Sequence, residues 1–166
     1  MKMYYVAINV SNREQLDEAI NSKRQVIIIE NSEGMYDLVN MSLKFKNSAK
    51  ALGVKGLKHY KLVKVDEENK EIVFCAKKIS SDDEEHYRRK SECSFADSRE
   101  ALYHLFDESC EAILVQEDIF DLYWAITMNR EGRKAFEPKR LEQLKQYEFG
   151  FPDLNNRDAV LVRKSQ

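Results

Sequence analysis

The sequence has little of several residue types whose clusters mark common functional sites. Its 166 residues include three cysteines, five glycines, two prolines and one tryptophan. Cys75, Cys93 and Cys110 have no C-x-x-C spacing, so the pattern favours reduced, mostly buried thiols over a disulfide framework or a zinc site. No glycine-rich phosphate loop follows a predicted strand, and only Gly34 lies near such a position. This lack argues against nucleotide binding of the common types.

Long apolar runs and a strong net charge are also lacking. Apolar runs such as Val26–Ile29 are far too short to span a bilayer, and the first residues have neither the apolar centre nor the cleavage site of a signal peptide. The composition is 43% hydrophobic and 34% charged, with a net charge of −2. These values predict a globular, cytoplasmic protein with no membrane partner and no whole-molecule attraction to nucleic acid.

An internal repeat is the main feature that the sequence does have. The stretch that begins at Leu57 recurs 87 residues later, without a gap, from Leu144 onward. Both stretches consist of two apolar segments around a turn rich in Asp and Asn, the pattern of a β-hairpin. Gapless agreement through strand, turn and strand favours duplication over a chance similarity of apolar spacing. The identical pairs are Leu57/Leu144, Lys58/Lys145, Tyr60/Tyr147, Asp66/Asp153, Asn69/Asn156, Val73/Val160 and Lys77/Lys164.

The first half of the chain predicts a β-α-β-α-β-β unit. Residues 3–10 and 25–30 are rich in the aromatic and β-branched types that suit strands. Between them, Ser11–Glu14 has the S-x-x-E form of a capping box and precedes an amphipathic helix. Such closely spaced strand, helix and strand segments predict a parallel βαβ unit. A second helix that begins near Met35 and the hairpin Tyr60–Ile79 complete the unit.

The second half repeats this pattern. The offset is 86 residues up to the second helix, where one added residue increases it to 87. Asp97–Glu100 takes the place of the first capping box, with Asp97 as the cap, and Ala112–Val115 takes the place of the second strand. The first strand, near Glu92–Phe95, has a weaker strand pattern. Pro138 predicts that the second helix breaks and restarts with the proline in its first turn.

We therefore predict a mixed α/β fold of two tandem β-α-β-α-β-β repeats, related by pseudo-two-fold symmetry, with mixed sheets flanked by helices. Residues 1–79 form the first repeat, 80–90 a charged connector and 91–166 the second repeat. One repeat alone would bury only about 60% of its chain surface, which favours one fused core.

The sequence offers two candidate catalytic arrangements, and each has a simpler explanation. Glu30, Glu33, Glu117 and Asp118 follow predicted parallel strands, where carboxylates hold a divalent cation in some α/β proteins. Helix capping and the helix dipole explain the same acids without a metal. A nucleophilic cysteine needs a base within hydrogen-bond reach, and no spacing of Cys and His suggests such a pair. We predict no cofactor, no metal and no catalytic residue.

Charge is the most unevenly distributed property. Seven lysines and no acid lie between Met41 and Lys64, and the equivalent part of the second half is also basic, although Glu131, Glu137 and Glu142 partly offset its charge. Two symmetry-related basic faces are therefore expected. The predicted binding surface comprises Lys44, Lys46, Lys50, Lys55, Lys58, Lys61, Arg130, Arg133, Lys134, Lys139 and Arg140.

These basic faces predict a non-enzymatic binding protein with a macromolecular partner, and a protein partner is our first expectation. One alternative is nucleic-acid binding through residues 44–64, with Phe45, His59 and Tyr60 available for stacking. The third hypothesis is a metal-dependent enzyme with its site at the acidic strand-end loops. Solvated helix faces explain the lysines without any partner. The composition is typical of bacterial phage and mobile-element products, including inhibitors of host nucleases, so we expect an inhibitor or adaptor.

Overall fold

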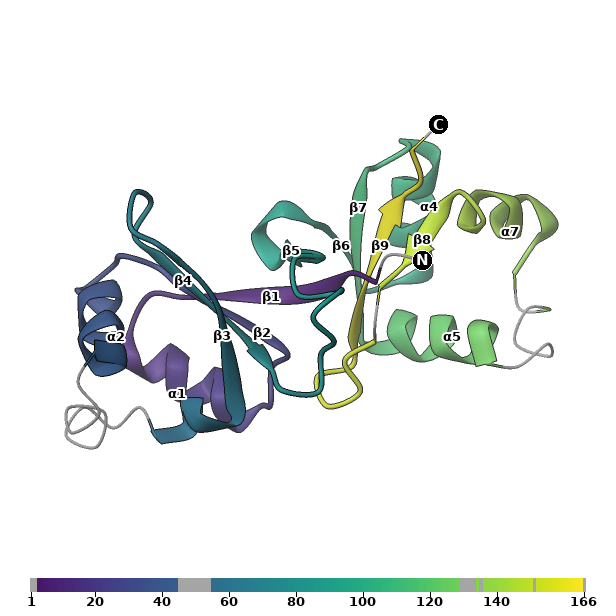
Figure 1. Cartoon of the computed structure of the whole chain (residues 1–166). Helices are drawn as coiled ribbons and strands as arrows, with labels where there is room; N and C mark the ends of the chain where they lie inside the picture. The colour runs from purple at the N-terminus through teal and green to yellow at the C-terminus, as the bar shows by residue number, and fades with distance from the viewer. Residues whose placement is uncertain (1–2, 45–54, 129–133, 135, 151, 166) are drawn as a thin grey trace. The chain divides into compact units, whose positions relative to one another are not determined.

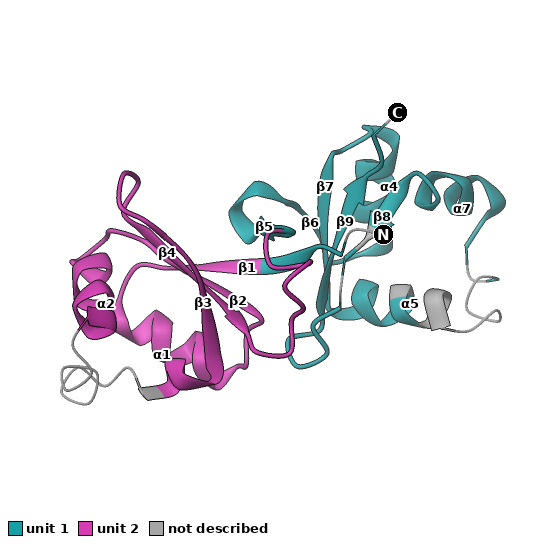
Figure 2. Cartoon of the chain, in the orientation of Figure 1, with its two compact units in different colours: residues 1–6, 86–166 teal, residues 7–85 magenta. Residues whose placement is uncertain are grey.

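The computed structural model describes residues 3–44, 55–128, 134, 136–150 and 152–165 (Figure 1). Within this part of the chain it is a mixed α/β structure with two mixed sheets and five α-helices, which confirms the mixed α/β class that the sequence predicts. No helix among these residues is long and apolar enough to cross a membrane. The chain divides into two compact units, of which unit 1 comprises residues 1–6 and 86–166 and unit 2 comprises residues 7–85 (Figure 2).

Unit 2 has the predicted order of elements. Strand β1 (Tyr5–Val10) begins in unit 1 and ends in unit 2. The elements that follow are α1 (Arg13–Asn21), β2 (Val26–Ile29), α2 (Met35–Lys44), the 3-10 helix η1 (Lys55–His59), β3 (Tyr60–Asp66) and β4 (Glu71–Ala76). β1 is parallel to β2, while β4 is antiparallel to β2 and to β3. The strand order is β3-β4-β2-β1, so the parallel pair and the hairpin are both confirmed.

Unit 1 contains the second set of elements. They are β5 (Tyr87–Arg89), the 3-10 helix η2 (Lys90–Glu92), β6 (Ser94–Ala96), α4 (Arg99–Asp107), β7 (Ala112–Gln116), α5 (Glu117–Met128), α7 (Pro138–Leu144), β8 (Tyr147–Phe149) and β9 (Asp158–Arg163). Its four-stranded sheet has the order β6-β7-β9-β8, and β5 extends the other sheet beside β1. Helix α7 begins at Pro138, as predicted.

The N-caps of α1 and α4 lie one residue later than predicted. Asn12 is the cap of α1, and its side chain accepts a hydrogen bond at 2.9 Å from the N–H three residues on. Ser98, and not Asp97, caps α4 in the same way at 3.2 Å. The Ser11 hydroxyl instead donates to the Glu30 carboxylate at 3.2 Å. At the start of both helices two neighbouring residues are good caps, and the second of them is used.

Strand order, strand direction and register are the same in the two units. Corresponding partners are Ile8–Ile27 and Ser94–Ile113 in the parallel pairs, Ile27–Phe74 and Ile113–Leu161 in the central antiparallel pairs, and Tyr60–Ala76 and Tyr147–Arg163 in the hairpins. Counterparts lie 86 residues apart in the first halves of the units and 87 apart in the hairpins, the offsets found in the sequence.

A tyrosine hydroxyl fixes the start of each hairpin. Tyr60 donates to the carbonyl of Arg24 at 2.6 Å, and Tyr147 donates to the carbonyl of Cys110 at 2.6 Å. Both acceptors lie in the loop between the first helix and the second strand of the unit. Each hydrogen bond therefore joins segments that are about 36 residues apart in sequence.

The turns of the two hairpins are also built alike. The Asp66 carboxylate accepts hydrogen bonds from the backbone and side-chain amides of Asn69 at 3.0 and 2.8 Å. Asp153 accepts the same pair from Asn156 at 3.2 and 2.9 Å. The residue after each Asn has a positive φ, of 57° and 51° respectively. The chain reverses direction by the same local chemistry in both places.

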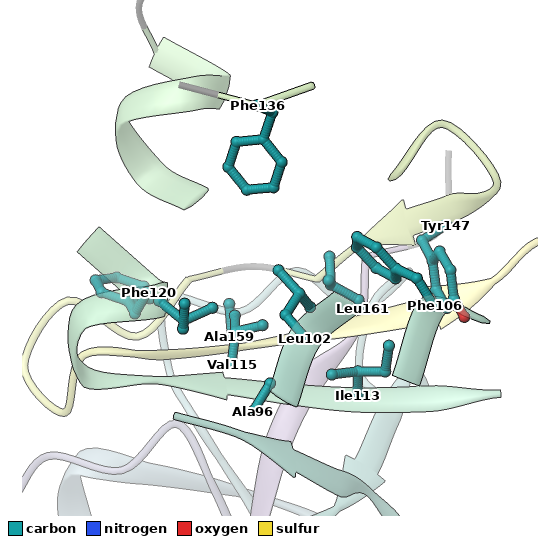
Figure 3. Close-up of a cluster of buried hydrophobic side chains, with 11 residues drawn as sticks. Ala96, Leu102, Phe106, Ile113, Val115, Phe120, Phe136, Tyr147, Ala159 and Leu161 are labelled. Carbon is teal, nitrogen blue, oxygen red and sulfur yellow. The ribbon is translucent and has the colours of Figure 1, made fainter. Parts of the chain in front are cut away.

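A hydrophobic core lies between the sheet and the helices of each unit. In unit 2 its buried residues are Val10, Leu16, Ala19, Ile27, Ile29, Met35, Tyr36, Val39, Ile72 and Phe74. In unit 1 they are Ala96, Leu102, Phe106, Ile113, Val115, Ile119, Phe120, Phe136, Tyr147, Ala159 and Leu161. Figure 3 shows the side chains of α4 facing those of β7 and β9 in unit 1.

Candidate functional site

The predicted basic surface of unit 2 lies in three elements. Lys44 ends α2 and Lys58 is in η1, and both side chains are exposed. Lys46 and Lys50 lie outside the described residues, and Lys55 begins η1 without a described side chain. The structure therefore places two exposed lysines, Lys44 and Lys58, on either side of residues 45–54 in the sequence.

Lys61 of β3 has a different environment from the other lysines. Its ammonium group lies 2.8 Å from the Glu84 carboxylate and donates to the carbonyl of Ile79. Its side chain is only 28% exposed. Both partners lie in the segment that follows β4, so Lys61 fixes this segment against the hairpin. Such a paired lysine has less charge to offer an external partner than Lys44 or Lys58.

In unit 1, Lys134 and Lys139 are exposed, whereas Arg130 and Arg133 lie outside the described residues. Arg140 of α7 is largely enclosed, with 16% of its side chain exposed. Its guanidinium lies 4.5 Å from the centre of the Tyr103 ring and donates to the Asp107 carboxylate at 2.6 Å. Since Tyr103 and Asp107 belong to α4, Arg140 joins the two helices.

The strand-end loops of unit 2 form a small polar cluster. The side-chain amide of Asn9 donates to Glu30 at 2.6 Å, and the Ser11 hydroxyl donates to the other Glu30 oxygen. In unit 1 the corresponding acids, Glu117 and Asp118, lie in the first turn of α5, where the helix dipole favours negative charge. No group of three His, Cys, Asp or Glu side chains that would hold a metal ion occurs among the described residues.

The three cysteines are free thiols. Burial raises the pKa of Cys75 and of Cys93 to about 11. Both side chains are therefore protonated at neutral pH, while the nucleophile in thiol chemistry is the thiolate. Cys110 is half-buried, and its Sγ lies 3.2 Å from the hydroxyl of Ser94. The thiols contact the carbonyls of Glu84, Arg89 and Ala112 and the Ser94 hydroxyl.

Unit 1 also contains a polar pocket of about 420 Å³ that the sequence did not predict. It is lined by Tyr4, Arg88 of β5, Glu111, Glu148 of β8, and residues 162–165 at the end of β9. The lining residues come from five separate stretches of the chain, so no local spacing in the sequence marks them. Their only common signal is that most of them are charged.

No protein-family model, curated protein or solved structure matches the chain. Its candidate sites are therefore assigned from its own side chains. Of the eleven predicted surface residues, the structure shows four as exposed, namely Lys44, Lys58, Lys134 and Lys139, and two as engaged within their own unit, namely Lys61 and Arg140.

Proposed function

We propose that the chain is a non-enzymatic binding protein, made of two tandem copies of one β-α-β-α-β-β unit that each present a basic surface to a protein partner. Exposed lysines in the segment before each hairpin carry this proposal; they do not occupy aligned positions, since the counterpart of Lys58 is Lys145. Lys58 lies in η1 directly before β3, and Lys139 lies in α7 shortly before β8. Both segments lead from the second helix of a unit to its hairpin.

Several details that a hydrophobic core does not require support duplication. Apolar periodicity recurs in unrelated units because every core needs it. A hydrophobic core requires neither the Asp–Asn turn nor the hydrogen bond from a tyrosine hydroxyl to a loop carbonyl. Both nevertheless recur in the second unit, at the hairpin offset of 87 residues. Lys23 and Ser109, 86 residues apart, also share a positive φ of 54° and 55° after the first helix. The pseudo-two-fold relation and the single fused core are parts of the same proposal.

The charges around α7 favour a protein partner over a phosphate backbone. Glu137 precedes Lys139 and is exposed, and the next lysine, Lys145, lies 2.9 Å from the carboxylate of Glu142. Acids beside lysines weaken attraction to a uniformly negative strand, but they suit a protein surface that carries both signs of charge. An inhibitor or adaptor, for example an antagonist of a nuclease, is the role that we propose for this binding.

The test is affinity capture with the full chain, followed by binding measurements on the purified partner. The double variant Lys58→Glu/Lys139→Glu reverses one exposed charge in each unit. The matched control, Lys77→Glu/Lys78→Glu, makes the same charge change at exposed positions after β4. We expect the wild type and the control to retain the partner and the first variant to bind it at least about ten-fold more weakly, the effect of about 1.4 kcal/mol.

Equal binding by all three proteins would contradict the proposal, and so would capture of no specific protein at moderate salt. The same variants are also titrated with single- and double-stranded oligonucleotides at several salt concentrations. Binding that falls steeply with salt, and that Lys58→Glu/Lys139→Glu abolishes, would favour nucleic-acid binding instead.

A further inference from the structure

The polar pocket of unit 1 lies at the end of β9, and part of its lining is on the sheet face away from the hydrophobic core. Val162, one of its lining residues, is the register partner of Glu148 and of Ala112, and it neighbours Leu161, which belongs to the core. Successive residues of a strand point to opposite faces. Val162 and Glu148 therefore share the face opposite to α4, whereas Arg163 is the register partner of the core residue Tyr147. The other lining residues are Tyr4, Arg88, Glu111, Lys164 and Ser165.

Charges of both signs line this pocket. Arg88, Arg163 and Lys164 supply three positive charges, and Glu111 and Glu148 supply two negative charges. Within the described chain, no salt bridge joins any of these cations to either acid. The ion pair of Arg88 is with Glu92 at 4.0 Å, and Arg163 donates to a backbone carbonyl at 3.1 Å.

We propose that the pocket binds a small zwitterion, a molecule that carries a phosphate or carboxylate group and an ammonium group. An anion alone would gain from the three cations but would be repelled by Glu111 and Glu148. A simple amine would be attracted by Glu111 and Glu148 but repelled by the three cations. A zwitterion satisfies both sets of charges, and each contact is a charge-assisted hydrogen bond. The volume of about 420 Å³ lies within the range of small-molecule sites.

This site is independent of the basic surface proposed for the protein partner, since the two share no residue. Loss of one is therefore distinguishable from loss of the other. The ligand is either a free small molecule or the charged end of a larger molecule. In both cases it carries the same two charged groups.

Isothermal titration calorimetry of the full chain with three matched compounds tests the proposal. Phosphoethanolamine carries both charges, inorganic phosphate carries only the negative charge, and ethanolamine carries only the positive charge. We expect phosphoethanolamine to bind about ten-fold more tightly than phosphate, the gain of one hydrogen bond between charged groups, and ethanolamine not to bind measurably. β-Alanine, titrated in the same way, shows whether a carboxylate replaces the phosphate. Equal binding of phosphate and phosphoethanolamine, or no binding of either zwitterion, would overturn the proposal.

Two variants are expected to change the affinities for phosphate and phosphoethanolamine in different ways. Lys164→Gln is expected to weaken both phosphate and phosphoethanolamine, because it removes a positive charge. Glu148→Gln is expected to weaken phosphoethanolamine about ten-fold and to leave phosphate binding unchanged or stronger, because it removes the partner of the ammonium group and a source of repulsion. The controls Lys77→Gln and Glu68→Gln, at exposed positions of unit 2, are expected to change neither affinity. Unchanged phosphoethanolamine binding in Glu148→Gln would refute the role of the acids.

Discussion

Asp66 stabilises the first hairpin turn as a charged group. The backbone N–H of Asn69, and then its side-chain amide, lower the pKa of Asp66 by hydrogen bonding to the carboxylate. A carboxyl group whose pKa is lower in the folded state stabilises the fold above its unfolded pKa and loses this contribution as the pH falls through the folded pKa. We expect Asp66→Asn to be less stable than the wild type at pH 7, and this deficit to shrink below about pH 4.

Urea unfolding at pH 7, 4 and 3 measures this difference. Glu68→Gln, at an exposed position of the same turn, is the control and is expected to unfold like the wild type at each pH. A deficit in Asp66→Asn that stays constant across the three values would show that the charge of the carboxylate is not the cause.

The tyrosines that pack in or against the two cores differ in whether the hydroxyl group has a partner. Tyr60→Phe and Tyr147→Phe each remove a hydroxyl that donates to a loop carbonyl, so each is expected to lower the free energy of unfolding by about 1 kcal/mol. Tyr36 is 1% exposed, and its hydroxyl has no hydrogen-bond partner among the described residues. Tyr36→Phe is therefore expected to leave stability unchanged or to raise it. Thermal and urea unfolding check this, and equal losses in all three variants would contradict it.

At the scale of elements, one arginine joins α7 to α4. Arg140→Lys keeps the charge but removes the planar group that lies over Tyr103 and donates to both Asp107 and Gln143. We expect a loss of about 1 kcal/mol and faster hydrogen exchange of the amides of α7. Lys139→Gln changes an exposed neighbour on the same helix and is expected to have no such effect. Unchanged exchange in Arg140→Lys would show that Arg140 does not hold α7, which would then depend on packing and on the hydrogen bond from the Gln143 amide to Asp107.

Elements with strong periodicity were predictable from the sequence, and elements fixed by distant partners were not. The parallel pair and the hairpins follow from runs of apolar residues and from the Asp–Asn turn, whose chemistry is local. The caps at Asn12 and Ser98 each follow another good capping residue, and the spacing alone does not distinguish the two. Strand β5 has three residues and no apolar alternation, and it forms where the carbonyl of His86 accepts a hydrogen bond from the N–H of Tyr5 at 3.0 Å.

The candidate sites also divide into features with a local sequence signal and features that only the folded chain brings together. Charge counts along the sequence identified the basic segments, but they did not show that Lys61 and Arg140 are engaged within their own units. The polar pocket was missed because its residues are brought together only by the folded sheet. A single sequence contains no signal that relates Tyr4 to Arg88 or Glu148.

At the scale of the whole molecule, Leu16 and Leu102 test whether the protein unfolds as one cooperative unit. They occupy equal positions of α1 and α4 and are 1% and 0% exposed. Strand β1 begins in unit 1 and ends in unit 2, so unfolding of either unit frees one end of this strand. Units of about 80 residues are also close to the lower limit of independent stability.

We therefore expect Leu16→Ala and Leu102→Ala each to destabilise the same single transition by about 2–5 kcal/mol, the cost of a cavity in a packed core. Differential scanning calorimetry measures this, with Leu154→Ala as the control because Leu154 is 60% exposed. Two resolved transitions, with each variant lowering only one of them, would show that the units are thermodynamically independent. In that case the fused core predicted from the sequence would be wrong, while the duplication of the unit would still stand.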